Sequence, residues 1–488
     1  MRFRSSAFAL ALALGITSVS ASAIAQSAEA TTVEERLRRQ EERLTAMEAQ
    51  IAAQDAELTR LRSALAAAKA PPVAPPTAPP TAPPTAARTV TPTAPSALEI
   101  ALQSLRLSGY VQSDLVLHRQ SSEDEVSPIG EPLNRDRFSI PRAHLRLDAA
   151  RSILAAALEI EAATTNGPVV RPVEASLSIR FQGPDRNGVP LFEGTTGLMK
   201  IPFGFEVPER DPHRLFLERS TTARALFPGL YDLGFRLHGG YRFIRYDIAF
   251  MNGQPLGDPL FPGRDPNASK DLVGRVGVDG TPASGLQIRA GLSALSGTGF
   301  HPGTPATKDV LVWRDANEDG LVQGTEIQVV AGAPRAPSED YHRFALGADL
   351  GLTARLPVIG ELTIFGEVVR GGNLDRGIEP ADPVGAGRDF RELGFHVAVT
   401  QELTRYAMLG VRYDRYDPDA DASEQRGVAR VPRSRVYSSI AVTAAARYLS
   451  GRLIFEYDRN RNALGRTPGG IPTSLADDAF TLRGEVVF

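Results

Sequence analysis

The sequence contains no cysteine among its 488 residues. This absence excludes a disulfide framework, a thiolate metal site, a cysteine nucleophile and an N-terminal lipidated cysteine. Lysine is also scarce and occurs only at Lys69, Lys200, Lys270 and Lys308, so arginine carries nearly all of the positive charge. The net charge of −3 gives the chain no basic excess, which argues against nucleic acid as a partner.

Long apolar runs are missing too, because no segment offers the 18 consecutive apolar residues typical of a transmembrane helix. The N-terminus instead shows Arg2 and Arg4, the short apolar stretch AFALALALGI, and the small-x-small site Ala23-Ile24-Ala25. This order predicts a secretory signal peptide over residues 1–25 and an exported mature protein.

Residues 30–69 are predicted to form a short α-helical coiled coil. Apolar residues recur every seven positions, at Leu37, Leu44, Ile51, Leu58 and Leu65. Such a narrow stripe cannot be buried by one helix alone, so an oligomer is expected, with the number of helices left open. Residues 70–97 are rich in proline and predict an extended polyproline II linker.

From residue 98 to residue 488 the apolar residues alternate with polar ones. In VEASLSIRF, for example, Val173, Ala175 and Leu177 alternate with Glu174 and Ser176. Sixteen segments of about 10 residues show this pattern, a length suited to a tilted membrane-spanning strand. They begin near residues 105, 137, 153, 172, 192, 230, 243, 271, 285, 341, 360, 388, 404, 434, 450 and 479.

The connections between these segments alternate between long and short, as in bacterial outer-membrane barrels. The expected fold is therefore an all-β, transmembrane, 16-stranded antiparallel β-barrel in the bacterial outer membrane, with the coiled coil in the periplasm. A soluble β-sandwich or propeller is the alternative, but a propeller should show a repeated blade motif and none is found. The closing strand ends at Phe488, and an aromatic end is the kind of signal that barrel assembly machinery reads.

Several segments resemble the phosphate-selective porin O and P family, which includes trimeric members with coiled coils and dicarboxylate-type members. These segments are LSGYVQSDLVL, RFSIPRAHLRLDA, GLMKIPFGFE, LERSTTARALFPGLYDLGFRLHG and GVRYDRYDPDAD, followed by the terminal Phe488. The resemblance implies a homotrimer in outer-membrane lipid with a water-filled lumen, and it implies that the loop over residues 204–229 folds inward. An outward cap or a latch between subunits is the alternative for this loop.

The candidate residues of the pore constriction are arginines. Four lie in the loop, at Arg210, Arg214, Arg219 and Arg224, and three lie on the lumen face of strands, at Arg142, Arg146 and Arg236. The loop also carries Glu206, Glu209, Asp211 and Glu218, a mixture unlike a pure anion trap. The lumen is expected either to favour small anions such as phosphate or carboxylates, or to have charges that pair off and select little.

Residues 315–326 have the spacing of an EF-hand calcium loop, although no helical pattern flanks them. The predicted ligands are Asp315, Asn317, Asp319, Leu321, Gln323 and Glu326, with Gly320 at the sharp turn. An ordinary Asp/Asn/Gly turn is the alternative. We expect a structural calcium ion that stabilises this exterior loop.

The predicted function is a porin for the diffusion of small hydrophilic solutes. The alternative is a structural protein that tethers the outer membrane to the cell wall through the coiled coil. An enzyme is not expected, because the seven histidines show no HExxH spacing and no serine lies in a G-x-S-x-G elbow.

Overall fold

The computed structural model describes residues 105–488, apart from 166, 183–188, 258–262, 427 and 433–434. The predicted signal peptide, coiled coil and proline-rich linker lie outside the described residues. Within the described part of the chain, no helix is long and apolar enough to cross a membrane.

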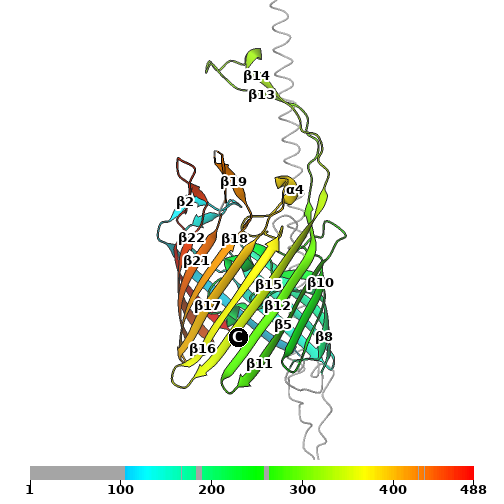
Figure 1. The fold of residues 1–488 in the computed structure, drawn as a ribbon, viewed down its shortest axis with the longest axis vertical. Helices are drawn as coiled ribbons and strands as arrows, with labels where there is room; N and C mark the ends of the chain where they lie inside the picture. The colour runs from blue at the N-terminus through cyan, green and yellow to red at the C-terminus, as the bar shows by residue number, and fades with distance from the viewer. Residues whose placement is uncertain (1–104, 166, 183–188, 258–262, 427, 433–434) are drawn as a thin grey trace, which may run out of the picture. The chain divides into compact units, whose positions relative to one another are not determined.

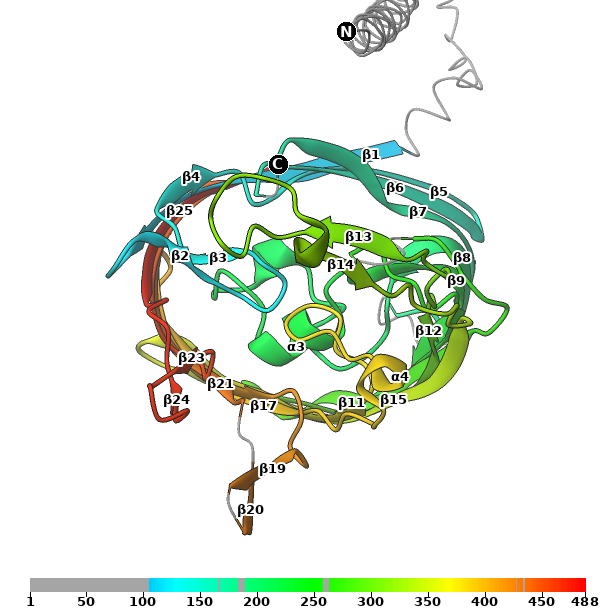
Figure 2. The same cartoon turned by 90° about the horizontal axis from the view of Figure 1, so that it is seen from above.

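Sixteen long antiparallel strands close into a barrel (Figures 1 and 2). Each pairs with its successor, and the last pairs with the first, with Leu115 opposite Leu482. The strands are β1 (Leu105–His118), β5 (Ala143–Arg151), β6 (Leu154–Ala163), β7 (Val169–Phe181), β8 (Phe192–Lys200), β9 (Tyr231–Tyr241), β10 (Ile244–Met251), β11 (Asp271–Ala283), β12 (Leu286–His301), β15 (Glu339–Leu356), β16 (Gly360–Gly372), β17 (Leu393–Thr404), β18 (Ala407–Asp417), β21 (Tyr437–Tyr448), β22 (Gly451–Arg461) and β25 (Ala479–Val487).

The observed strands confirm the predicted barrel, with one correction near its start. The segment expected from residue 137 is divided into a short β4 (Arg137–Ser139) and β5. Pro141 lies in the break between them, where its missing N–H cannot donate to a strand ladder. The starts expected near residues 388 and 404 are also a few residues early for β17 and β18.

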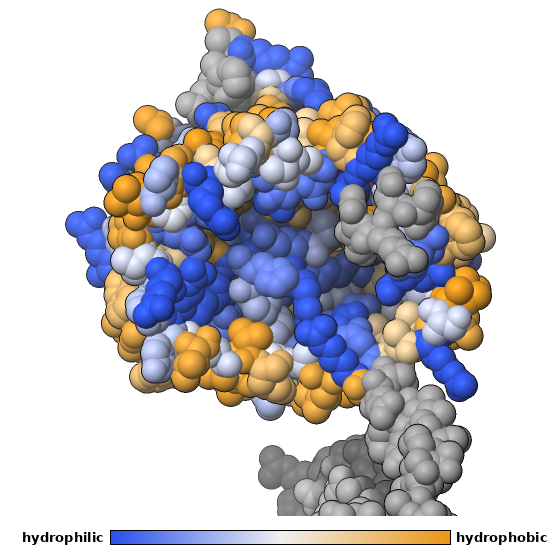
Figure 3. All heavy atoms as spheres, turned by 90° about the horizontal axis from the view of Figure 1, so that it is seen from below, coloured by the Kyte–Doolittle hydropathy of each residue, from blue (hydrophilic) through white to orange (hydrophobic). Residues whose placement is uncertain are grey.

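The period-two pattern separates a lipid face from a water face. Apolar side chains point outward, and Leu107, Leu177 and Leu292 are each more than 60% exposed on the isolated barrel. Viewed from below, the interior is a polar hollow ringed by apolar residues (Figure 3). This arrangement is that of a membrane-spanning barrel and rules out the soluble β-sandwich, in which the apolar faces would be buried.

The two ends of the barrel differ. At one end, tight turns join successive strands, and several contain a residue with positive φ, such as Ser152, Arg242 and Leu449. We call this end the short-turn side, which in bacterial barrels faces the periplasm. The opposite end, the long-loop side, carries the small elements β2 (Ser122–Val126), β3 (Pro132–Asn134), α4 (Pro383–Ala386), β19 (Ser423–Arg426), β20 (Ala429–Pro432), β23 (Gly465–Arg466) and β24 (Pro472–Thr473).

The fifth long loop is a tall ribbon. Its tip is the hairpin of β13 (Val310–Trp313) and β14 (Ile327–Val330), with the short helix η2 (Gly324–Glu326) between them, and it stands well above the barrel (Figure 1). The predicted calcium loop therefore joins two strands and not two helices, which explains why the sequence shows no flanking helical pattern.

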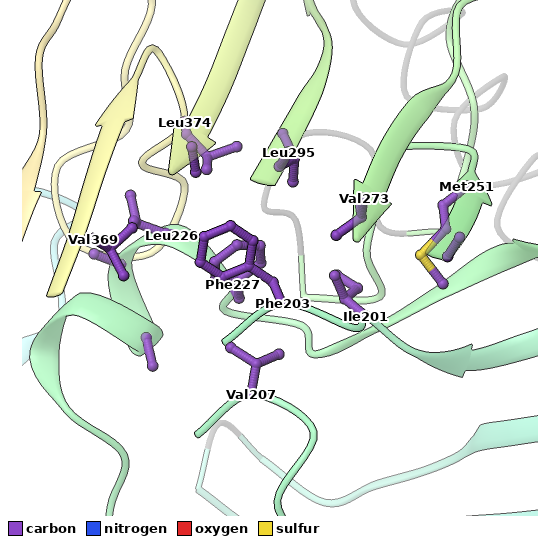
Figure 4. Packing of buried hydrophobic residues seen from close by; sticks show 14 of the residues in the cluster. Ile201, Phe203, Val207, Leu226, Phe227, Met251, Val273, Leu295, Val369 and Leu374 are labelled. Atoms are coloured by element: carbon purple, nitrogen blue, oxygen red, sulfur yellow. The ribbon is translucent and has the colours of Figure 1, made fainter. Parts of the chain in front are cut away.

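The third long loop, residues 201–230, folds into the barrel interior. It contains the short helices η1 (Asp211–His213) and α3 (Thr221–Leu226), and α3 lies inside the ring of strands (Figure 2). We call this segment the inward loop. The main apolar core forms where Phe203, Val207 and Phe227 of this loop pack against wall residues such as Val273 and Leu295 (Figure 4).

Candidate functional site: the constricted lumen

The inward loop is fixed to one half of the barrel wall by hydrogen bonds to its backbone. Glu367 of β16 accepts from the N–H groups of Phe205 at 3.0 Å and Glu206 at 3.2 Å. Glu456 of β22 accepts from the N–H of Leu217 at 3.2 Å. These buried carboxylates satisfy amides that have no partner within regular secondary structure.

Wall arginines satisfy the carbonyl groups of the same loop. Arg412 donates to the carbonyl of Glu218 at 2.7 Å. Arg483 donates to the carbonyl of Leu217 at 2.9 Å and forms a two-pronged pair with Asp114, both contacts at 2.7 Å. The half of the interior facing β12–β25 is thus filled by the loop and its anchors, and we call it the sealed half.

A compact ion network lies inside the loop. Asp211 is buried between Arg214 and Arg219, with Nη1 of Arg219 3.0 Å from the carboxylate. Burial alone would raise the pKa of Asp211, but these arginines and Arg142 hold it well below its usual range. The Asp211 carboxylate therefore stays charged and ties the tip of the loop together.

The opposite half of the interior, facing β5–β9, is open. A cavity of about 520 Å³ lies on the short-turn side of the inward loop, and one of about 630 Å³ lies on the long-loop side. Asp211 of the loop and Tyr231 of β9 line both cavities. Asp211 and Tyr231 therefore lie between the two cavities, and we call this place the constriction.

Two aromatic rings flank the constriction. Tyr110 of β1 stacks on His144 of β5 with a centroid distance of 4.7 Å, and its hydroxyl donates to Asp211 at 3.0 Å. Lys200, at the end of β8, donates to the carbonyl of Glu209 at 2.8 Å and lies over the ring of Tyr231. The constriction is thus bounded by the loop on one side and by the four strands β1, β5, β8 and β9 on the other.

Many charges on the open wall are paired. Arg146 contacts Glu159 at 2.8 Å and Asp148 at 2.9 Å, and it also pairs with Glu174. Arg180 pairs with Glu193 and Arg236 pairs with Asp247, each with a contact of 2.7 Å. The expectation that wall charges pair off therefore holds for these strands.

The structure divides the predicted constriction arginines into those paired with a carboxylate and those without such a partner. Arg214 and Arg219 are 7% and 3% exposed and bind Asp211 inside the loop, so the expectation that they face solutes is corrected. Arg142 forms a two-pronged pair with Glu218. Arg210 and Arg224 are exposed, line the cavities, and have no carboxylate partner among the described residues.

Sequence reasoning missed the residues at the constriction itself, namely Tyr110, His144, Lys200, Asp211 and Tyr231. Two signals were present. Asp211 lies between Arg210 and Arg214 in the loop, and Lys200 is a rare lysine directly before the loop begins. The positions of the aromatic residues depend on strand register, which single strands do not reveal.

The predicted calcium ligands lie at the tip of the fifth loop. Asp315 accepts from the N–H of Gly320 at 2.8 Å, and Asn317 donates to Asp319 at 3.0 Å. Glu326 accepts from the indole N–H of Trp313 at 3.1 Å. Over the described residues, no group of three or more His, Cys, Asp and Glu side chains is placed to hold a metal ion. Calcium binding stays a prediction.

No family model and no curated protein matches this chain. Among solved structures, OprB of Pseudomonas putida matches with a TM-score of 0.50 at 10% identity, covering 80% of this chain and 96% of that one. The chain has the fold of an outer-membrane porin. The anion-selective porin of Comamonas acidovorans gives a TM-score of 0.48 at 11% identity, covering 79% and 99%. The outer-membrane channel DcaP of Acinetobacter baumannii gives 0.47 at 11%, covering 79% and 97%.

Proposed function

We propose that this porin-fold chain forms a water-filled channel in the bacterial outer membrane through which small hydrophilic solutes diffuse. The observation that carries the proposal is the pair of polar cavities on either side of Asp211 and Tyr231 inside a closed barrel. A path of this kind takes a solute from one side of the inward loop to the other. Because the inward loop fills much of the barrel interior, the expected solutes are small molecules.

We further propose that the channel favours anions. Arg106, Arg210 and Arg224 line the cavities and have no carboxylate partner among the described residues, whereas most carboxylates there are held by arginine. Unpaired positive charge in a pore with low-dielectric walls attracts anions and repels cations. Phosphate and carboxylates are the expected solutes.

The test is single-channel conductance of the purified full-length protein in planar bilayers. Reversal potentials in asymmetric KCl should show anion preference, and the double variant Arg210→Gln/Arg224→Gln should move the reversal potential toward that of a non-selective pore. The matched control is Arg355→Gln/Arg405→Gln, because both of these arginines line none of the cavities described above. An unselective wild-type channel would refute anion preference, and an absence of conductance would refute the channel.

A homotrimer assembled with help from the coiled coil is part of the same proposal, supported by the sequence resemblance to the phosphate-selective porin O and P family. Deleting residues 30–69 separates two roles of the coil. Loss of trimers, measured by the mass of the detergent-solubilised protein, indicates that the coil fixes the oligomer. Intact trimers with weaker attachment to purified cell wall indicate the tether.

We also propose that calcium binds Asp315, Asn317, Asp319, Leu321, Gln323 and Glu326. The spacing of these oxygen ligands supports the proposal, together with positive φ at Gly320, which gives the loop its sharp turn. A calorimetric titration of the protein with calcium should show a weak site that Asp315→Ala/Glu326→Ala removes. Binding that persists in this variant would contradict the assignment.

A further inference from the structure

A third cavity lies beside the solute path on the short-turn side. Its volume is about 440 Å³, and it is bounded by the first part of the inward loop and by strands β9–β12. It shares Pro208, Arg210 and His238 with the short-turn cavity of the main path, so the two cavities are direct neighbours. Its size falls within the range of binding pockets for small organic molecules.

Three arginines from three different elements line this side cavity without a carboxylate partner among the described residues. They are Arg210 of the inward loop, Arg245 of β10 and Arg289 of β12. The other charged wall residues are occupied, because Arg275 pairs with Asp349 at 2.9 Å and Asp247 pairs with Arg236. Glu209 of the inward loop adds one carboxyl to the lining, so the side cavity holds three guanidinium groups without a bound partner and one further acidic side chain.

Two of these guanidinium groups are held in place. Arg289 lies over the ring of Phe205 at 4.7 Å from its centroid. Arg245 donates from Nη1 to the carbonyls of Arg242 at 2.6 Å and Ile244 at 2.9 Å, and it lies across Gly240, where a Cβ would be 3.0 Å from Nη1. These contacts leave Nε and Nη2 of Arg245, and the N–H groups of Arg289, to bind a ligand.

Such fixed forks suit oxyanions, since guanidinium presents paired N–H donors that match a carboxylate or phosphate. A ligand with a single negative charge would neutralise one guanidinium group and leave the other two without a partner. A ligand with several oxyanion groups can neutralise all three, and holding the arginines in advance reduces the entropy lost on binding.

We propose that the side cavity is a binding site for small organic or inorganic molecules carrying two or more carboxylate or phosphate groups. The proposal rests on the proposed channel function, because the ligand reaches the site through the lumen. The site retains polyanions on the short-turn side of the constriction, and it is separate from Arg224 on the long-loop side.

The test measures block of chloride current through the full-length protein by citrate, pyrophosphate and acetate, with glucose as the neutral probe. Citrate and pyrophosphate should block at concentrations at least about tenfold lower than acetate, since each additional charge-assisted hydrogen bond strengthens binding about tenfold or more. Block by citrate alone identifies carboxylates as the ligands, and block by pyrophosphate alone identifies phosphates. Equal, weak block by all three anions would overturn the proposal.

The variant Arg245→Gln/Arg289→Gln should lose the high-affinity block by about tenfold or more. Arg355→Gln/Arg405→Gln makes the same charge change, also on the short-turn side, at residues outside the side cavity. An equal loss in this control would show that long-range charge alone attracts the anions and would overturn the site. Arg289→Lys keeps the charge without the fork and should give intermediate block. Open-channel conductance in every variant tests the proposed function separately.

Discussion

The sealed and open halves of the barrel interior use the same residue types for different purposes. In the sealed half, Arg483 and Arg412 donate to backbone carbonyls of the inward loop, and Glu367 and Glu456 accept from its amides. In the open half, charged residues line cavities. A charged residue on the lumen face is therefore evidence of selectivity only after its partner is known.

The difference follows from what an irregular loop requires inside a barrel. The inward loop has only short helices, so many of its N–H and C=O groups lack partners of their own, and unpaired buried groups are costly. Wall side chains with several donors or acceptors satisfy these groups. The loop can then be rigid although it has little regular secondary structure. Because it is held against the sealed half, it leaves the solute path in the open half free.

Among the substitutions considered, Arg483→Leu should destabilise the sealed half the most. Asp114 is 6% exposed and would lose its charged partner, so the barrel should be destabilised by about 3–5 kcal/mol. The measurement is the urea midpoint of unfolding in lipid vesicles. Arg355→Leu, which breaks an ion pair at an arginine that is 74% exposed, should cost no more than about 1 kcal/mol. Equal costs would contradict the distinction between buried and exposed pairs.

A steric change tests how tightly α3 packs against the wall. A Cβ at Gly394 would lie 2.0 Å from the hydroxyl of Thr222, so Gly394→Ala should displace α3 and cost about 1–3 kcal/mol. Unfolding midpoints and single-channel conductance measure the effect. Gly484→Ala makes the same change where a Cβ would meet no atom within 4 Å, and it should behave like the wild type. A silent Gly394→Ala would show that the loop moves freely.

Removing one anchor should loosen the loop without unfolding the barrel. Glu456→Ala leaves the N–H of Leu217 and the hydroxyl of Thr443 without their acceptor, at a cost of about 1–3 kcal/mol. We expect flickering single-channel currents and faster hydrogen exchange at Leu217. Glu456→Gln retains an oxygen acceptor and should lie closer to the wild type. Steady currents in Glu456→Ala would mean that the anchor is dispensable.

The smallest effect concerns Glu209, which lines the side cavity, and it depends on pH. Burial raises the pKa of Glu209 to about 6, against the opposing effect of Arg214, so this carboxyl is neutral below about pH 6 and negative above it. Anion preference should therefore be greater at pH 5 than at pH 7.5, as measured by reversal potentials.

Glu209→Gln should flatten this dependence. His213 and His238 line the same side cavity, and their protonation would add positive charge in the same direction. An unchanged pH dependence in Glu209→Gln would assign the effect to these histidines and contradict the role of the carboxyl.

The sequence predicted the barrel well because strand alternation is a local signal. The starts of β8, β11 and β25 are at the predicted residues 192, 271 and 479. Charge pairing is not local, since Arg483 and its partner Asp114 are 369 residues apart in sequence and meet only when the barrel closes. Arg214 and Arg219 were expected to face solutes for a different reason. Their partner Asp211 is only three and eight residues away, but the loop is irregular, so no periodic pattern shows which of its side chains turn inward.

The great length of β12 and β15 determines which part of the barrel an approaching molecule meets first. Crossing a membrane takes about 9–11 tilted residues, but β12 has 16 and β15 has 18. The surplus raises the β13–β14 tip far from the lipid (Figure 1). An antibody or a bacteriophage arriving from that direction reaches the β13–β14 tip before the rest of the described barrel. Apart from the proposed calcium ligands, residues of this tip can therefore change without altering the permeation route below.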